Sequence, residues 1–424
     1  MPEALNNLPN QEKVFLAVLD FKKERNRWSP EDLRQEMEEL VTACGGRVVG
    51  AKIIRIQTPT AGYLITPAAA NELAQVCALQ AVDTVIFSYD LKGSQQRNLE
   101  EVIQRKTIDR TQLILDIFAR RAQSLEGKMQ VELAQLEYLR PRLVGKSPEL
   151  SRLGGGIGTS GPGETKLEVD RRRISERVDH LKKNLKEIAQ DRGLKRKKRK
   201  DQGIPMISLV GYTNAGKSTL LNALTDAGQI TKDGLFTTLD PLSRQMLLPN
   251  RQKVIISDTV GFMQALPHHL IEAFMATLEE VKEADILLHV LDVSNPKFEN
   301  LHQAVVDVLT QLEANDKTII TVLNKIDQLT DREALTRYQS LFKEAVCISA
   351  KTGENMDELI NLISKTFSAR MGEIDVTIPI ARMDLVHLAH KEGQVYSIKY
   401  YDTAIHIRGS VPGHLAGQFK KAAS

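Results

Sequence analysis

The sequence contains few cysteines and few aromatic residues, and it has no long hydrophobic run. Its 424 residues include three cysteines, one tryptophan and 5% aromatic residues in total. Cys44, Cys77 and Cys347 lie far apart in the chain, which excludes a disulfide framework and a metal site built on paired cysteines. The best apolar stretch, Ala284–Val293, is interrupted by charged residues and is shorter than the ~20 residues that span a bilayer. No basic-then-apolar signal pattern begins the chain, so we expect a cytoplasmic protein with no membrane span.

The length and composition indicate several globular domains. Domains cluster at about 100–200 residues, so 424 residues are too many for one. The hydrophobic fraction of 42% supports sizeable cores, and the charged fraction of 26% is ordinary for a folded protein. Wholesale disorder and fibrous structure are therefore excluded.

Positive charge is concentrated in one segment. The net charge is +3, but Arg171–Lys200 holds 14 Lys and Arg against 4 Asp and Glu, a net charge of +10 that leaves −7 for the rest. The segment ends in six consecutive cations, Lys195–Lys200. Such a run is common at a solvated helix end, and a nuclear-import signal has the same composition. Clustered Lys and Arg also bind nucleic acid, because they displace the counterions of the phosphates.

The first part of the chain alternates between two types of segment. Three segments are strand-like and two have helical spacing of their apolar residues: Val14–Phe21, Arg47–Ile56 and Asp83–Tyr89 for the strands, Glu31–Ala43 and Ala68–Ala78 for the helices. This alternation predicts a small parallel α/β domain over residues 1–110.

The next part predicts a long antiparallel helical hairpin over residues 111–203. Thr111–Leu143 is helical in pattern, the glycine-rich stretch Leu153–Gly163 interrupts it, and a long charged helix follows. The two apolar stripes consist of Leu125, Met129, Leu133, Leu136 and Leu143, then Leu167, Ile174, Val178, Leu181, Leu185 and Ile188. The glycine-rich tip is either a flexible linker or a loop whose N–H groups contact phosphate or RNA. The helix start at Gly163-Glu164-Thr165 favours the second.

Residues 204–370 return to an α/β pattern, and 371–424 predict a small α+β domain. The strongest motif lies in the first of these. The buried strand Met206–Val210 leads into Gly211-x-x-x-x-Gly216-Lys217-Ser218 and a helix, which is the context that a phosphate-binding loop requires. Its backbone N–H groups surround a β-phosphate, the lysine bridges the β- and γ-phosphates, and the serine hydroxyl ligates Mg²⁺.

Four further elements follow in the order expected of a GTPase. Asp258–Gly261, after a strand, supplies an Asp that can hold Mg²⁺ through water and a glycine N–H for a γ-phosphate. Asn324–Asp327 ends in a carboxylate that accepts two hydrogen bonds from guanine and that adenine would leave unpaired. Ser349–Lys351 offers a backbone N–H to guanine O6. Phe236–Asp240 contains the hydroxyl expected to reach Mg²⁺ when a γ-phosphate is present, and we expect it to be Thr238, with Thr237 as the competitor.

Each short string is weak alone, but five in order predict GTP and GDP binding and GTP hydrolysis with Mg²⁺. The candidate nucleotide-binding residues are Gly211, Tyr212, Thr213, Asn214, Ala215, Gly216, Lys217, Ser218, Phe236, Thr237, Thr238, Leu239, Asp240, Asp258, Thr259, Val260, Gly261, Asn324, Lys325, Ile326, Asp327, Ser349, Ala350 and Lys351. Among them, Lys217, Thr238 and Gly261 are the candidate catalytic residues, and Ser218 and Thr238 are the candidate metal ligands.

Several runs outside these motifs carry a family resemblance that extends across Asn98–Gly372. They are Leu99 with Ile108–Thr111, Ile114–Ala119 with Arg121-Ala122, Gln130–Leu136, Gly155–Gly158 with Gly161–Thr165, and the loop Gly211–Ser218. The chain resembles the HflX-type ribosome-associated GTPases of the Obg–HflX branch. The resemblance implies binding to the large ribosomal subunit, with the hairpin and the glycine-rich loop reaching ribosomal RNA, and a role in rescuing or splitting stalled ribosomes or in subunit assembly.

Two departures from the family pattern have consequences. Ser160 stands where the family usually has Arg, which removes one RNA contact. Tyr63–Pro67 replaces a glycine-rich Gly-x-Gly-Lys segment, which puts a second nucleotide site in the N-terminal domain in doubt.

Two other classes of function compete with a ribosome-gated GTPase. One is a nucleotide-modulated RNA-binding protein with incidental GTP turnover, and the other is an interaction module whose hairpin docks a protein. No serine-hydrolase, paired-carboxylate or zinc pattern is present, and His268-His269 fit surface histidines. We expect a monomer.

The position after Asp-x-x-Gly is Phe262, where small GTPases usually have a water-orienting Gln. Slow intrinsic turnover is therefore expected, and either the ribosome or a K⁺ ion at Asn214 would compensate. The alternative for Asn214 is a residue that simply tolerates the loop's turn geometry.

Overall fold

The computed structural model describes residues 11–21, 28–143, 166–201, 204–225, 242–250, 252–263, 275–368 and 371–423. Three regions of the sequence predictions lie outside these described residues: the glycine-rich stretch Leu153–Gly163, the segment Phe236–Asp240 and His268-His269. The side chains of Lys195–Lys200 also lie outside them. The chain divides into two compact units, the first formed mainly by residues 1–189 and the second mainly by the rest.

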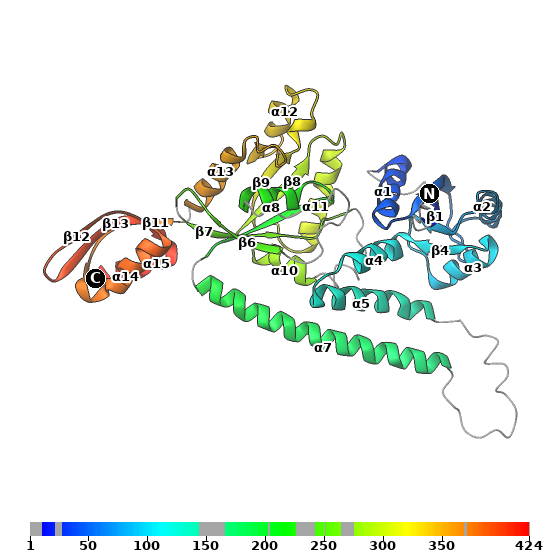
Figure 1. Cartoon of the computed structure of the whole chain (residues 1–424), viewed down its shortest axis with the longest axis horizontal. Coiled ribbons are helices and arrows are strands. Elements are labelled where there is room, and N and C mark those ends of the chain that lie inside the picture. The colour runs from blue at the N-terminus through cyan, green and yellow to red at the C-terminus, as the bar shows by residue number, and fades with distance from the viewer. Residues whose placement is uncertain are drawn as a thin grey trace, which may run out of the picture. The chain divides into compact units, whose positions relative to one another are not determined.

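The first unit contains a four-stranded parallel sheet in the order β2-β1-β3-β4 (Figure 1). Its strands and helices are β1 (Lys13–Phe21), α1 (Pro30–Ala43), β2 (Arg47–Ile56), α2 (Pro67–Leu79), β3 (Thr84–Phe87), α3 (Gly93–Ile103), β4 (Lys106–Asp109) and α4 (Arg110–Arg121). The central strand β1 is a run of apolar residues because both faces of a parallel sheet are covered. Ser29 caps α1 and Thr66 caps α2, each with a proline in the first turn.

The helix expected over Thr111–Leu143 is interrupted. Helix α4 ends at Arg121 and packs against α1, β3 and β4, and α5 (Leu125–Leu139) begins after the cap Ser124, whose side chain accepts from Gly127 N. The chain then forms the 3-10 turn η1 (Arg140–Leu143). Leu125 is 68% exposed, so its expected place on the apolar stripe was wrong. The cap residue explains the interruption, because a serine hydroxyl at this position starts a new helix, and Leu125 in its first turn lies outside the cluster between α5 and α7.

Helix α7 (Lys166–Asp201) packs beside α5 along part of its length. The shared apolar cluster contains Leu133, Val178 and Leu181, with Met129, Leu136, Ile174 and Leu185 around it. Arg177 binds Glu132, and Lys182 binds Glu137 at 2.7 Å, so both flanks of the seam carry ion pairs. Figure 1 shows the two helices running in opposite directions.

The second unit contains a six-stranded sheet in the order β10-β9-β8-β5-β7-β6, in which β6 is antiparallel to β7 and the other neighbours are parallel. The strands are β5 (Met206–Gly211), β6 (Leu242–Leu247), β7 (Lys253–Asp258), β8 (Ile286–Asp292), β9 (Thr318–Asn324) and β10 (Ala345–Cys347). The helices and turn are α8 (Lys217–Thr225), α10 (Met275–Glu283), α11 (Phe298–Gln311), η2 (Ile326–Gln328), α12 (Ala334–Ser340) and α13 (Met356–Ser368). The strand β6, at one edge of the sheet, was not expected from the sequence, although its more buried and its exposed residues alternate.

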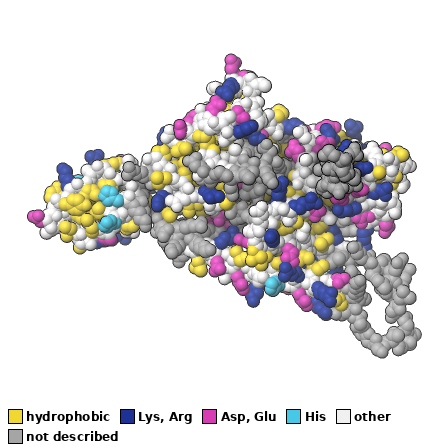
Figure 2. Space-filling model, viewed as in Figure 1, with side chains coloured by type: hydrophobic (Ala, Val, Ile, Leu, Met, Phe, Trp, Pro, Cys, Tyr) yellow, Lys and Arg dark blue, Asp and Glu magenta, His cyan; other side chains and the backbone are white. Residues whose placement is uncertain are grey.

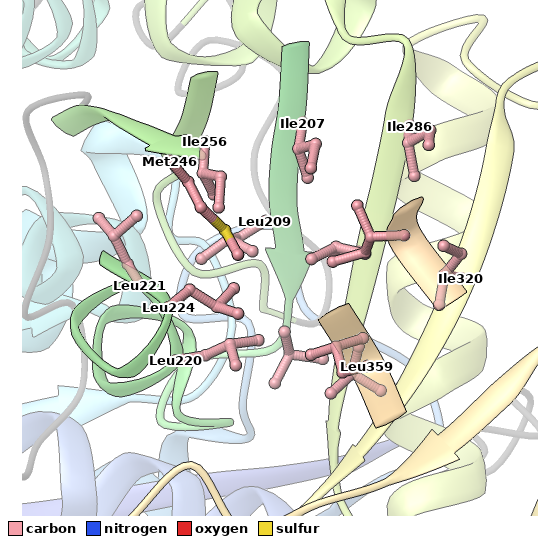
Figure 3. Packing of buried hydrophobic residues seen from close by; sticks show 14 of the residues in the cluster. Ile207, Leu209, Leu220, Leu221, Leu224, Met246, Ile256, Ile286, Ile320 and Leu359 are labelled. Atoms are coloured by element: carbon pink, nitrogen blue, oxygen red, sulfur yellow. The ribbon is translucent and has the colours of Figure 1, made fainter. Parts of the chain in front are cut away.

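One face of this sheet packs against α8 and α13. Figure 3 shows side chains from β5, β7 and β8, such as Ile207, Ile256 and Ile286, directed toward Leu220 of α8 and Leu359 of α13. All five are fully buried. This packing fixes the strand ends that carry the nucleotide motifs.

A three-stranded antiparallel sheet in the order β11-β13-β12 follows in the second unit. Its elements are β11 (Met371–Pro379), η3 (Ile380–Arg382), α14 (Met383–Glu392), β12 (Gln394–Tyr400), β13 (Ala404–Pro412) and α15 (Gly413–Ala423). Its core includes Ile405, Ile407 and Phe419. No helix among the described residues is long and apolar enough to cross a membrane.

Candidate functional site

The phosphate-binding loop connects the end of β5 to α8. Strand β5 is buried along its whole length, and the loop turns through Asn214, which is exposed and has a φ of 62°. Gly216 has a φ of 95°, and a Cβ there would lie 2.3 Å from Asn324 Nδ2. A side chain is therefore excluded both by backbone strain and by the close approach of the neighbouring motif.

Lys217 opens α8 with a buried side chain directed back into the loop. Its Nζ donates to the carbonyl oxygens of Gly211 and Tyr212 at 3.0 and 2.8 Å. Burial lowers the pKa of Lys217 to about 8, an effect that the nearby Asp258 partly offsets. The loop therefore holds the ammonium group of Lys217 at its centre, where a polyphosphate would bind.

Ser218 and Asp258 meet at the end of β7. The Ser218 hydroxyl donates to Asp258 Oδ2 at 2.7 Å, and Asp258 is 1% exposed. A hydroxyl and a carboxylate are hard oxygen donors of the kind that Mg²⁺ prefers, so this pair fits the ion. The described residues contain no group of three or more His, Cys, Asp and Glu that could hold a metal, so phosphate oxygens and water would have to complete the coordination.

The segment after Asp258 is bonded to the phosphate loop. Phe262 N donates to Gly211 O at 3.0 Å, and Thr213 N donates to Phe262 O at 2.8 Å. A Cβ at Gly261 would lie 2.8 Å from Thr213 Cα and 3.2 Å from Lys217 Nζ. Gly261 therefore packs directly over the lysine, where only glycine fits.

Two residues of this segment face the protein interior. The Thr259 hydroxyl donates to Leu209 O at 2.6 Å, and Val260 is 6% exposed. Both were among the candidate nucleotide-binding residues, and their side chains are occupied in the fold. Any nucleotide contact from them would have to use the backbone.

Asn324 joins three motifs at the carboxyl edge of the sheet. Its Nδ2 donates to Ala215 O of the phosphate loop at 2.9 Å, and its Oδ1 accepts from Ala350 N at 3.0 Å. Asn324 is 2% exposed, so both bonds are sheltered from water and hold the loops in a fixed relation.

Asp327 is oriented by the third motif. Ser349 Oγ donates to Asp327 Oδ1 at 2.7 Å, and Ser349 Oγ accepts from Thr352 N at 3.2 Å. Ser349 is fully buried, whereas Lys351 is exposed. The hydrogen bond from Ser349 therefore fixes the orientation of the Asp327 carboxylate.

Two neighbours of the candidate site were not among the residues predicted from the sequence. Asp292 ends β8 beside Asn324, and its Oδ2 lies 2.7 Å from Lys325 Nζ. His289, three residues earlier in β8, stacks on His302 with ring centroids 5.0 Å apart. Burial, with His302 and Lys217 adding to it, lowers the pKa of His289 to about 3, so this ring is neutral. The signal for Asp292 was its position directly after a buried strand, as for Asp258 and Asn324.

The described candidates thus meet at the carboxyl ends of β5, β7, β9 and β10, while Phe236, Thr237, Thr238, Leu239 and Asp240 lie outside the described residues. A parallel sheet with a glycine-rich loop before α8 and this order of motifs defines the P-loop GTPase class. Family models described as GTP-binding GTPase N-terminal, GTP-binding GTPase Middle Region and 50S ribosome-binding GTPase match residues 31–119, 121–199 and 206–325.

Relatives covering nearly the whole chain are called GTPase HflX. The protein of that name from Lacrimispora saccharolytica is 42% identical over 98% of this chain and 97% of its own length. Those from Caldanaerobacter subterraneus and Escherichia coli are 43% and 38% identical over 90% and 87% of this chain, and over 89% and 86% of their own lengths. The chain therefore belongs to the HflX family of GTPases and is a GTP hydrolase, which confirms the resemblance seen in the sequence.

Proposed function

We propose that the GTP site lies at this edge of the sheet and that its nucleotide state gates binding to the large ribosomal subunit. In this arrangement Lys217 and the loop N–H groups hold the phosphates. Ser218 and Thr238 would hold Mg²⁺, which would supply positive charge against the γ-phosphate. Asp327 and the Ser349–Lys351 backbone recognise guanine. The observation that carries the assignment is the bonding of Asn324 to both Ala215 and Ala350, which joins the phosphate and base sites.

Nucleotide gating is supported by the position of Gly261. It packs over Lys217, the residue that would meet the γ-phosphate, and Phe262 is bonded to the phosphate loop. A γ-phosphate between Lys217 and Gly261 would displace this segment, whereas GDP would not reach it. Two states of one segment are what a GTP-dependent switch needs.

We propose four functional parts, bounded at 1–110, 111–203, 204–370 and 371–424, acting as a monomer in the cytoplasm. The helical hairpin of the second part would contact ribosomal RNA through its glycine-rich tip and its basic end. Support comes from the family model over residues 206–325, which is described as a 50S ribosome-binding GTPase, and from the charge of +10 over Arg171–Lys200. The run Lys195–Lys200 holds +6 of this charge, and positive and negative side chains are mixed along the described part of α5 and α7 in Figure 2.

The physiological role that fits these parts is the rescue or splitting of stalled ribosomes, or the assembly of ribosomal subunits. The alternative is a nucleotide-modulated RNA-binding protein with incidental GTP turnover. It predicts equal RNA affinity with GTP and GDP, because the switch segment would then not act on the RNA-binding part.

Replacing the six cations of Lys195–Lys200 by Gln is expected to weaken binding to large ribosomal subunits and to flatten its salt dependence. Each lost phosphate contact lowers the log–log salt slope by about one. Filter binding or sedimentation over a salt series measures the slope. GTP affinity, the control, is expected to stay unchanged because the run precedes β5. An unaltered slope would make the run only a solvated helix end.

Phe262 has a consequence for hydrolysis. Its side chain is 1% exposed and a phenyl ring cannot hydrogen-bond water, so we propose slow intrinsic turnover that another group accelerates. The candidates are the ribosome, ordering the segments around Thr238 and Phe262, and a K⁺ ion held by the Asn214 carbonyl oxygen and the phosphates, which would act as an arginine finger does. The positive φ of Asn214 also suits a residue that only shapes the turn.

Turnover in K⁺ is expected to exceed turnover in Na⁺ at fixed ionic strength, and Asn214→Ala is expected to remove the difference. Measurements of phosphate release with and without large subunits separate the two sources of acceleration. Equal rates in both salts would eliminate the K⁺ site. If large subunits do not stimulate turnover, the ribosome does not compensate for the missing water-orienting residue at Phe262.

A further inference from the structure

Asp292 ends strand β8 and holds the lysine of the Asn324–Asp327 motif. Its Oδ2 lies 2.7 Å from Lys325 Nζ, with the two side chains 17% and 21% exposed. Its Oδ1 accepts from Ser294 N at 3.0 Å and from the Ser294 hydroxyl. The carboxylate is thus fixed on one side by its own turn and directed with the other oxygen at the lysine.

The backbone around Lys325 is already fixed, so the ion pair sets the direction of its side chain. Asn324 is bonded to Ala215 O and Ala350 N. Ile326 is 1% exposed and its N–H donates to Ile348 O at 3.3 Å. Lys325 itself has a φ of 66°, which sends its side chain away from the course of the strand. A lysine stem is flexible, and the contact with Asp292 holds its end.

We propose that Asp292 is a positioning residue of the guanine site: it holds the Lys325 stem extended beside Asp327, where its methylenes form an apolar wall for the purine ring. A lysine stem can cover apolar surface while its ammonium stays with a polar partner. Fixing the stem before binding removes an ordering cost from nucleotide association. This inference rests on the proposed guanine site and adds to it a residue on a different strand.

The test is the affinity for GDP, measured by titration calorimetry with the full chain, for Asp292→Asn, Lys325→Ala and the double variant. Asp292→Asn keeps the shape and leaves an oxygen for Ser294, but turns an amide toward the ammonium. We expect about tenfold weaker GDP binding in Asp292→Asn, because the lysine stem is then no longer fixed before the nucleotide binds. The rate at saturating GTP is expected to be unchanged, because the base lies away from the reacting phosphate. The double variant is expected to bind no more weakly than Lys325→Ala.

The matched control is Asp285→Asn, directly before the first residue of the same strand. Asp285 Oδ2 accepts from Met206 N at 2.9 Å, so the control removes a comparable charge far from the nucleotide, and GDP affinity is expected to stay the same. Ser294→Ala, which loosens the Asp292 carboxylate without removing it, is expected to weaken GDP binding by about threefold, and it keeps the proposal testable if Asp292→Asn unfolds.

Additive losses in the double variant would overturn the proposal, since Asp292 would then act independently of Lys325. Weaker GDP binding by Lys325→Ala, with unchanged binding by Asp292→Asn and Ser294→Ala, would overturn the role of Asp292 and leave the guanine site itself in place. Unchanged GDP affinity in Lys325→Ala would overturn both this proposal and the place given to Lys325 in the guanine site.

Discussion

Asp327→Asn is expected to exchange a preference for guanine nucleotides for a preference for xanthine nucleotides. Ser349 Oγ donates to one oxygen of the Asp327 carboxylate at 2.7 Å, and in the proposed site the carboxylate would accept from guanine N1–H and the 2-amino group. In the variant, the side-chain amide of the new asparagine would donate to the O2 atom of xanthine. This bond would replace the one that the Asp327 carboxylate accepts from the 2-amino group of guanine. A bidentate charged contact corresponds to roughly 10²–10⁴-fold discrimination. Competition of XDP and GDP for the purified protein measures the exchange.

The control for this exchange is Asp331→Asn. Asp331 is exposed and its Oδ1 accepts a local bond from Glu333 N in the turn before α12, so its charge is removed without changing the Asn324–Asp327 motif. Unchanged GDP affinity in Asp327→Asn would refute the assignment of the Asn324–Asp327 motif.

Lys217→Met is expected to lower kcat/KM for GTP by about 10²–10³-fold. The ammonium lies within the loop, bonded to Gly211 O and Tyr212 O, and removal of one such electrostatic donor from a reaction site has effects of this size. Steady-state phosphate release measures the loss, and Lys253→Met, on an exposed position of β7, is the matched control.

The stability of the nucleotide-free Lys217→Met protein is expected to change little. The variant loses two hydrogen bonds, but it also loses a buried charge whose pKa the fold lowers to about 8. Thermal unfolding of both forms checks this. A large drop in the unfolding temperature together with lost turnover would show that Lys217 supports the fold and would contradict its catalytic assignment.

Motifs at strand ends were predictable because the pattern that makes a buried strand also fixes where its polar successor lies. Asp258, Asn324 and Ser349 each follow a run of buried residues, and the parallel sheet brings them to one edge. The packing of α5 on α7 was likewise predictable, because apolar residues recur at heptad spacing along each helix, among them Leu133 in α5 and Val178 in α7.

Other features depend on contacts between distant residues and leave no local pattern. The cap Ser124 that separates α4 from α5 resembles any surface serine until the packing of α4 on the first sheet is known. The pairing of Asp292 with Lys325 joins residues 33 positions apart, at the ends of the neighbouring strands β8 and β9. The bond between Thr213 and Phe262 depends on the course of two loops. Sequence spacing alone determines none of these.

Co-sedimentation with separated ribosomal subunits in GTP, in GDP and in a non-hydrolysable GTP analogue tests the central claim most directly. If the Gly261 segment responds to the γ-phosphate and gates ribosome binding, the protein will sediment with large subunits in the analogue and be released in GDP, and small subunits will not retain it. Equal sedimentation in all three nucleotides, or none with large subunits, would contradict the account.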